Sequence, residues 1–327
     1  MMRSLLLAGL LLLLPSLGYA ACTLPASTAS FGSVTTFVAN TTVSSVTTNA
    51  NVNCGSGSSL SLSLLGNNQI TFQLTGATNS NGTRGTLKRS GDTGSDNVPV
   101  RLCTDTACAT ELTIGGTPFV YGSQTLINLA GLLGSLNFAI PVYLRTVPGQ
   151  VVAAGTYQVT LNMAVTYRIC TSVGVGNLCL SEQTGSGVIP INITAILTND
   201  CTTITSPNIS FGSAPLVGSF SAVSQTINVL CSKGSTYTVG LSNGSYAAGS
   251  VRNMASGANR LSYEIYKSTT SNRWGSAGTE RWSSTTSTAV STDGLTRGFN
   301  YTARILTTQN TPPAGNYSDS VVVDLSF

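Results

Sequence analysis

Histidine is absent from this sequence of 327 residues. The chain therefore cannot form a Ser/His or Cys/His catalytic dyad, and it lacks the commonest ligand of protein-bound zinc. The segment GDTGS (91–95) is similar to the Asp-Thr-Gly of aspartic proteases, but that chemistry needs two such loops and the motif occurs once. Asp92, Asp96 and Asp105 lack the spacing of an EF-hand, although calcium binding by a loop stays open. We predict no enzyme, no cofactor and no metal site.

Charged residues are scarce, at 8% of the chain, with 15 Lys and Arg against 11 Asp and Glu. A net charge of +4 spread this thinly forms no basic stripe, so nucleic acid is not an expected partner. Aromatic residues are also few, and both tryptophans, Trp274 and Trp282, lie in the C-terminal half. The N-terminal half thus offers little for sugar rings to stack on, and a carbohydrate-binding (lectin-type) site is only an alternative.

Long apolar runs are missing after the first twenty residues. Residues 1–20 combine a short basic start, an apolar stretch over Leu5–Pro15 and small residues before Ala21, which predicts a secretory signal peptide cleaved after Ala20. A lipoprotein cleavage box with Cys22 as the acylated residue is the alternative. No later segment approaches the roughly 18 apolar residues of a membrane-spanning helix. Export to an oxidising compartment would let the eight cysteines form disulfides.

The abundant residues are Ser, Thr, Gly, Asn and Val, which favour strands and turns. The chain also contains one pattern twice: Cys22 and Cys201 each precede a Phe-Gly pair, a Val-rich strand ending in a second cysteine, and an alternating strand. Each copy closes with Ala-Gly-x-Tyr before a long alternating strand. We predict an all-β protein of two immunoglobulin-like β-sandwich domains, residues 21–198 and 199–327.

The repeat suggests how the cysteines pair. Cys22–Cys54 and Cys201–Cys231 would tie equivalent strands in the two copies, whereas Cys103–Cys108 and Cys170–Cys179 would close small loops in the first copy only. Eight cysteines formally allow 105 connectivities, so this pairing is a prediction.

The second copy differs at its end. In the first copy a strand with alternating Ile189, Ile191 and Ile193 follows the Ala-Gly-x-Tyr strand, whereas nothing equivalent follows in the second copy. A sandwich lacking its last strand exposes an apolar groove, bordered here by Val321, Val323, Leu325 and Phe327, which a strand from another chain can fill. The alternative is a domain that is complete with six strands.

The second copy resembles the spore coat protein U domain, the subunit domain of archaic (Csu-type) chaperone–usher pili. The resemblance covers essentially all of residues 200–327, and the first copy shares it only at its two ends. The matching marks are Cys201, Phe211-Gly212, Cys231, LSNGS (241–245), RNM (252–254), LSYEIY (261–266), RWGSAG (273–278) and AGNYSDSVVVDLSF (314–327).

The resemblance implies an assembly route and a cellular location. Such subunits are held by a periplasmic chaperone, passed to an outer-membrane usher and completed by a donor strand from the adjacent pilin subunit. A mature chain that starts at Ala21-Cys22 has no extension before its first cysteine and would accept a strand but offer none, which implies a place at the fimbrial tip on the cell surface. The two-domain arrangement is similar to that of Csu-type tip adhesins, so the resemblance implies surface attachment and biofilm formation.

Three apolar loops of the first copy are candidates for contact with a hydrophobic surface, abiotic or of a host. The expected residues are Leu126, Ile127, Leu129, Leu132 and Leu133 in the first loop, Val147, Pro148, Val151 and Val152 in the second, and Val173, Val175 and Leu178 in a ten-residue cysteine loop. A small disulfide ring has no room to bury its own apolar side chains, so that loop carries the hypothesis. The alternatives are that these residues belong to the core, or that the protein is a non-adhesive structural relative.

Overall fold

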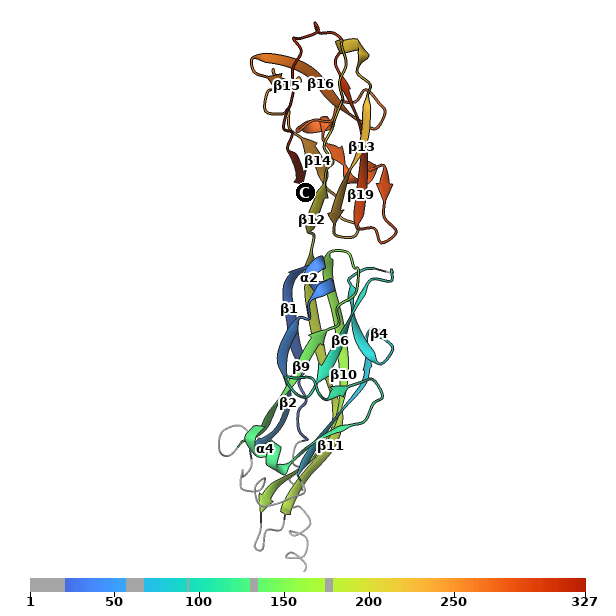
Figure 1. The fold of residues 1–327 in the computed structure, drawn as a ribbon. Coiled ribbons are helices and arrows are strands. Elements are labelled where there is room, and N and C mark those ends of the chain that lie inside the picture. The colour runs from blue at the N-terminus through green and yellow to red at the C-terminus, as the bar shows by residue number, and fades with distance from the viewer. Residues whose placement is uncertain (1–20, 57–67, 93, 130–134, 174–178) are drawn as a thin grey trace, which may run out of the picture.

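The computed structural model describes residues 21–56, 68–92, 94–129, 135–173 and 179–327. Strands dominate it, and they fall into two groups that lie end to end (Figure 1). Residues up to Thr198 are called the N-terminal domain below, and residues from Cys201 the C-terminal domain. Only Asn199 and Asp200 separate the last strand of the first from the first strand of the second. Within the described ranges, no helix is long and apolar enough to cross a membrane.

The N-terminal domain is built on one sheet that folds over its own core. Its main path runs β1-β11-β10-β5-β6-β9-β2, and β3 joins it through β10. Its elements are β1 (Ser27–Thr35), α2 (Thr36–Thr41), β2 (Ser45–Ser56), β3 (Gln69–Ala77), β4 (Ser80–Asn81), β5 (Arg84–Arg89), β6 (Asn97–Cys103), β7 (Glu111–Leu112), β8 (Phe119–Gly122), α4 (Ser123–Leu129), β9 (Ser135–Thr146), β10 (Gly155–Val173) and β11 (Cys179–Thr198).

The C-terminal domain has two smaller sheets, ordered β12-β13-β19-β16-β15 and β17-β14-β20. Together with the N-terminal domain this is the predicted all-β architecture of immunoglobulin-like sandwiches. Its elements are β12 (Cys201–Thr205), η1 (Val217–Ser219), β13 (Val223–Cys231), β14 (Thr238–Leu241), β15 (Arg252–Ser256), β16 (Asn259–Lys267), η2 (Gly278–Glu280), β17 (Trp282–Ser283), η3 (Ser284–Thr286), β18 (Ala289–Val290), β19 (Thr296–Ile305) and β20 (Val323–Ser326).

Strand alternation explains how the core forms. Along β11, Ile189, Ile191 and Ile193 point inward and are buried, whereas Val188 and Ile196 point to solvent. Because successive side chains of a strand face opposite sides, a single register puts the whole apolar set into the core. The structure also contains the four predicted disulfides, Cys22–Cys54, Cys103–Cys108, Cys170–Cys179 and Cys201–Cys231.

The two copies of the repeat share their strand register. In the N-terminal domain Met163 pairs with Leu74, and in the C-terminal domain Val323, the same distance after the Ala-Gly-x-Tyr motif, pairs with Leu241. The tyrosines of the motif also act alike: Tyr157 and Tyr317 each donate a hydroxyl hydrogen bond of 2.7 Å to the carbonyl oxygen four residues earlier. Positions in β10 can therefore be matched one to one with positions in the segment that ends in β20.

Two polar contacts join the domains. One carboxylate oxygen of the buried Asp96 accepts from the backbone N–H of Ala153 at 2.8 Å, and the other accepts from Lys233 Nζ at 2.5 Å. Beside this pair, the hydroxyl groups of Thr36 and Ser232, both buried, lie 2.6 Å apart. Ser232 and Lys233 directly follow the Cys201–Cys231 disulfide, so these contacts connect the N-terminal domain to a cross-linked part of the C-terminal one.

We expect Lys233→Met to loosen this junction. The substitution keeps most of the side chain's length but removes the charge that pairs with Asp96, at a cost of about 0.5–1 kcal/mol for a partly exposed ion pair. Small-angle X-ray scattering should then show a wider range of overall dimensions. Lys88→Met, which removes a lysine that does not bridge the domains, is the control. Unchanged scattering from Lys233→Met would mean that the buried hydroxyl contact alone holds the junction.

Candidate functional site

A groove of about 450 Å³ runs along the C-terminal domain. One wall is the segment 206–211, which continues from β12, and the other is the segment 317–323, which leads into β20. The floor consists of apolar and aromatic side chains from the strands between these walls: Ile227, Leu241, Met254, Tyr263, Ile265 and Tyr301.

Both walls offer unpaired backbone. Among residues 201–327, all of which the structure describes, β20 pairs with β14 on one side and with no strand on the other. Likewise β12 pairs only with β13. A groove with an apolar floor between two free strand edges has the form that accepts an added strand.

The N-terminal domain shows the same place filled. There, β11 lies between β1 and β10, parallel to the first and antiparallel to the second. Its buried Ile191 pairs with Ser27 on one side and Leu161 on the other. By the matched register, Leu161 corresponds to Val321 on the wall of the groove. The groove of the C-terminal domain thus corresponds to the position that β11 fills in the N-terminal domain.

The predicted groove residues divide into two groups. Val321 and Val323 line the groove and are half-buried. Leu325 is half-buried and packs against the core of the C-terminal domain. Phe327 is exposed, with its ring centroid 6.2 Å from that of Tyr237, and it does not line the groove. Their role in binding a strand stays a prediction.

One side of the groove is polar. Tyr263 on the floor donates its hydroxyl to Oδ2 of Asp319 at 2.8 Å. Burial raises the pKa of Tyr263 above its ordinary value, and the hydrogen bond to Asp319 raises it further. The phenol therefore stays protonated at neutral pH and acts as a donor to the carboxylate.

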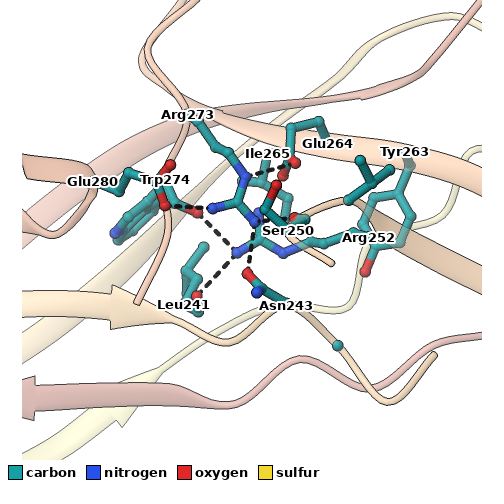
Figure 2. A network of polar contacts seen from close by, with 12 residues as sticks. Leu241, Asn243, Ser250, Arg252, Tyr263, Glu264, Ile265, Arg273, Trp274 and Glu280 are labelled. Atoms are coloured by element: carbon teal, nitrogen blue, oxygen red, sulfur yellow. Dashed lines mark hydrogen bonds and ion pairs between the residues drawn. The ribbon is translucent and has the colours of Figure 1, made fainter. Parts of the chain in front are cut away.

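A buried ionic network adjoins the groove floor (Figure 2). Arg252, which is fully buried, forms an ion pair with Glu264 and donates from Nη2 to the carbonyl oxygens of Leu241 and Trp274, at 3.0 and 2.8 Å. Arg273 Nε donates to the other carboxylate oxygen of Glu264 at 2.7 Å. The network thus connects β15 and β16 of one sheet to β14 of the other. Burial lowers the pKa of Arg252, and the negative charge of Glu264 acts against that shift.

Sequence reasoning did not assign this network a role, although RNM and LSYEIY were noted as motifs. The signal in the sequence was Glu264, a charged residue with apolar neighbours on a predicted strand. A glutamate at such a position is also common where a strand faces solvent, so the signal is weak. No group of three or more histidine, cysteine, aspartate or glutamate side chains that could hold a metal occurs in the described part of the chain.

The predicted surface loops do not lie together. The hairpin of β10 and β11 spans the N-terminal domain, from Gly155 paired with Leu197 near the C-terminal domain to Val173 paired with Cys179 at the opposite end. The latter is called the distal end below. Helix α4 also lies at this end (Figure 1). The described residues that flank 57–67, 130–134 and 174–178 lie there as well.

The prediction of surface exposure is wrong for two residues. Leu126 on α4 is fully buried, because the short helix turns it and the half-buried Leu129 onto the core. Val152 is only 3% exposed, because the adjacent Ala153 is tied to Asp96 and draws the loop inward. Neither residue can contribute apolar surface.

The second loop lies at the wrong end for a tip. Gly149 N–H donates to the carbonyl oxygen of Asn40 in α2 at 2.7 Å, beside the contacts to the C-terminal domain. The half-buried Val147 and Pro148 and the exposed Val151 thus belong to the junction end of the domain. Of the remaining predicted residues, Leu132, Leu133, Val175 and Leu178 lie outside the described residues, and the side chains of Ile127 and Val173 are not described.

The sequence reasoning missed one exposed apolar residue at the distal end. Leu180 on β11 is 71% exposed and directly follows Cys179 of the small cysteine loop. An isolated exposed leucine is ordinary on protein surfaces, but this one lies at the distal end, where described residues flank two of the three predicted loops. Its place after the cysteine was the signal available in the sequence.

Comparison with solved structures finds the same fold elsewhere. The tip adhesion subunit in the CsuC–CsuE pre-assembly complex of archaic Csu pili from Acinetobacter baumannii is 23% identical, with 94% of this chain and 100% of that chain covered and a TM-score of 0.57. CfaE, the adhesive subunit of CFA/I fimbria of enterotoxigenic Escherichia coli, is 10% identical over 93% of both chains with a TM-score of 0.38. At the level of sequence, no curated protein matches significantly.

The family assignment comes from the sequence itself. Residues 11–164 and 188–324 match the profile of the Spore Coat Protein U domain, in agreement with the resemblance seen in the second copy. The two matches cover both domains and most of the chain. The chain therefore belongs to the Spore Coat Protein U domain family.

Proposed function

We propose that this protein is the tip adhesin of a chaperone–usher pilus, joined to the fibre through its C-terminal domain and attached to surfaces through the distal end of its N-terminal domain. It is an exported, non-enzymatic protein at the fimbrial tip on the cell surface. The observation that carries the proposal is the groove beside β20, since β11 occupies the matching place in the N-terminal domain. Donor-strand complementation by the adjacent pilin would fill it.

The same groove implies the partners met on the way to the surface. Until a pilin strand arrives, an exposed apolar groove is an aggregation hazard, so a periplasmic chaperone would cover it. At the outer-membrane usher, the pilin strand would replace the chaperone in the groove. The similarity to a chaperone–tip adhesion subunit complex supports this assembly route.

The distal end suits contact with a hydrophobic surface. It lies opposite the C-terminal domain and so would point away from the fibre, and it presents Leu180 beside the Cys170–Cys179 disulfide. A disulfide stiffens the neighbouring strand ends, which reduces the entropy lost on contact. Many fibres acting together would turn weak apolar contacts into firm attachment and biofilm formation. The predictions for Leu132, Leu133, Val175 and Leu178 belong to this part of the proposal.

We expect Leu180→Ser to weaken attachment to polystyrene several-fold while fibre assembly stays normal. The leucine is exposed, so its loss removes apolar contact area without opening a cavity, and each lost contact of this kind is worth up to about 1.5 kcal/mol. Val188→Ser is the matched control, because Val188 is also an exposed apolar residue of β11, is 49% exposed and lies nearer the middle of the strand. Equal attachment by the two variants would contradict the role of the distal end. A lectin-type adhesin is the competing function, and it would instead show attachment that free sugars inhibit.

A further inference from the structure

The strand that completes the C-terminal domain must meet a different surface from the one that β11 meets. The matched register gives each inward-facing residue of β10 a counterpart in the segment of the C-terminal domain that ends in β20. Gln158 pairs with Lys88 on the neighbouring strand, and Ser318, its counterpart, exchanges backbone hydrogen bonds of 2.9 and 3.1 Å with Ala255. The residue that follows in sequence, whose side chain faces inward, is Val159 in the N-terminal domain and Asp319 in the C-terminal domain.

In the N-terminal domain this position is apolar. Val159 is buried and pairs with Ile193 of β11, which in turn pairs with Ala29 of β1. The counterpart of Ala29, counted from the Phe-Gly pair that both copies share, is Ile209 on the opposite wall of the groove. A strand seated in the groove would therefore place one inward side chain between Ile209 and Asp319.

Asp319 is held in a defined orientation. Its Oδ1 accepts from the backbone N–H groups of Ser245 and Ser320, both at 2.8 Å, and its Oδ2 accepts from Tyr263 Oη at 2.8 Å. Gly244, with φ +82°, makes room for the carboxylate, since a Cβ there would lie 1.9 Å from Oδ2. Within residues 201–327, Tyr263 is the one side chain that donates to Asp319.

Covering this carboxylate has a consequence. A carboxylate has about four acceptor sites, and the three bonds to Asp319 leave one, on Oδ2. A strand with an aliphatic side chain at this position would remove water from that site and supply nothing in return, which is unfavourable. A side chain with a hydroxyl group would supply the missing donor.

We propose that Asp319 makes the groove selective for a strand with a hydrogen-bond donor, threonine or serine, opposite Asp319 and apolar side chains opposite Val321 and Val323. The partner chemistry is thus an alternating apolar strand with one polar exception. This inference rests on the proposed strand-accepting role of the groove. It assigns Asp319 a role in choosing the partner, in addition to its contacts within the domain.

The test uses the full chain with a strand fused after Phe327. A short turn leads into a second copy of residues 185–198, so that the copies of Ile189, Ile191 and Ile193 face Val323, Val321 and Asp319. The position copied from Ile193 is made threonine in one fusion and valine in another, because these side chains have nearly the same shape. Thermal unfolding is followed by tryptophan fluorescence, which reports on the C-terminal domain alone because both tryptophans lie there.

With Asp319 present, the threonine fusion should unfold about 4 °C above the valine fusion. In the Asp319→Val background, which restores the residue of the N-terminal domain, the order should reverse. Valine equal to or above threonine in both backgrounds would overturn the inference. If neither fusion unfolds at a higher temperature than the unfused chain, the strand-accepting groove itself is refuted.

A second variant covers the case in which Asp319→Val does not fold. Asp319→Asn keeps the size of the side chain but replaces one acceptor oxygen with an NH2 group. The advantage of threonine over valine should then shrink to less than half. An undiminished advantage would overturn the inference, because it would show that the preference does not come from the carboxylate.

Discussion

Replacing Arg252 by alanine is expected to destabilise the C-terminal domain by about 3–5 kcal/mol, which is a large part of the stability of a domain this size. The truncation removes the partner of the buried Glu264 and leaves the carbonyl oxygens of Leu241 and Trp274 without their donor. A buried charge that loses its partner costs far more than an exposed ion pair is worth, because it has been taken out of water and is no longer compensated.

Urea unfolding monitored by tryptophan fluorescence measures this loss. Arg260→Ala is the control: Arg260 lies on the same strand pair, but it is exposed and bonds only to nearby carbonyl oxygens and the ring of Tyr246. It should cost less than about 1 kcal/mol. A loss below 1 kcal/mol for Arg252→Ala would show that Arg273 alone can hold Glu264.

The network has a functional meaning if the groove accepts a strand. Leu241, Tyr263 and Ile265, which lie on the groove floor, are each adjacent in sequence to a residue of the network or contribute to it directly. A domain without a strand on the free side of β20 gains less from its apolar core, so polar bonds between its two sheets carry more of its stability. This gives a physical reason for three charged side chains inside a β-sandwich.

The repeat made much of the fold predictable. Equivalent cysteines fixed two disulfides, and the alternation of Ile189, Ile191 and Ile193 identified β11 as a strand present in only one copy. Such features depend on local period and on internal comparison, and both can be read from one sequence. The same comparison contained the signal for Asp319, a carboxylate where the first copy has a buried valine.

The surface residues were harder to predict because burial depends on distant partners. Leu126 looked like part of an apolar finger, but it lies in a short helix whose inward side rests on the core. Val152 was grouped with a loop that turned out to adjoin the domain junction. Apolar loop residues and apolar core residues have the same composition, so only the three-dimensional arrangement separates them.

Val321→Lys is expected to lower the incorporation of this protein into fibres at least about tenfold while leaving the free chain folded. In the free chain the side chain lies at an open groove, so the new ammonium group keeps its water and costs little. Once a strand covers the groove, the ammonium group would lose its water and lie against apolar side chains, which is unfavourable even with the carboxylate of Asp319 two residues away. The measurement is the amount of protein in sheared fibres from cells that also make the chaperone, usher and pilin.

Val322→Lys is the matched control, because Val322 is the next residue along the same segment, is 63% exposed and does not line the groove. It adds the same charge to the opposite side and should leave incorporation unchanged. Tryptophan fluorescence of both purified variants shows whether the C-terminal domain has folded. Normal incorporation of Val321→Lys would contradict strand docking, because no strand could seat over an ammonium group at that position without losing its apolar contacts.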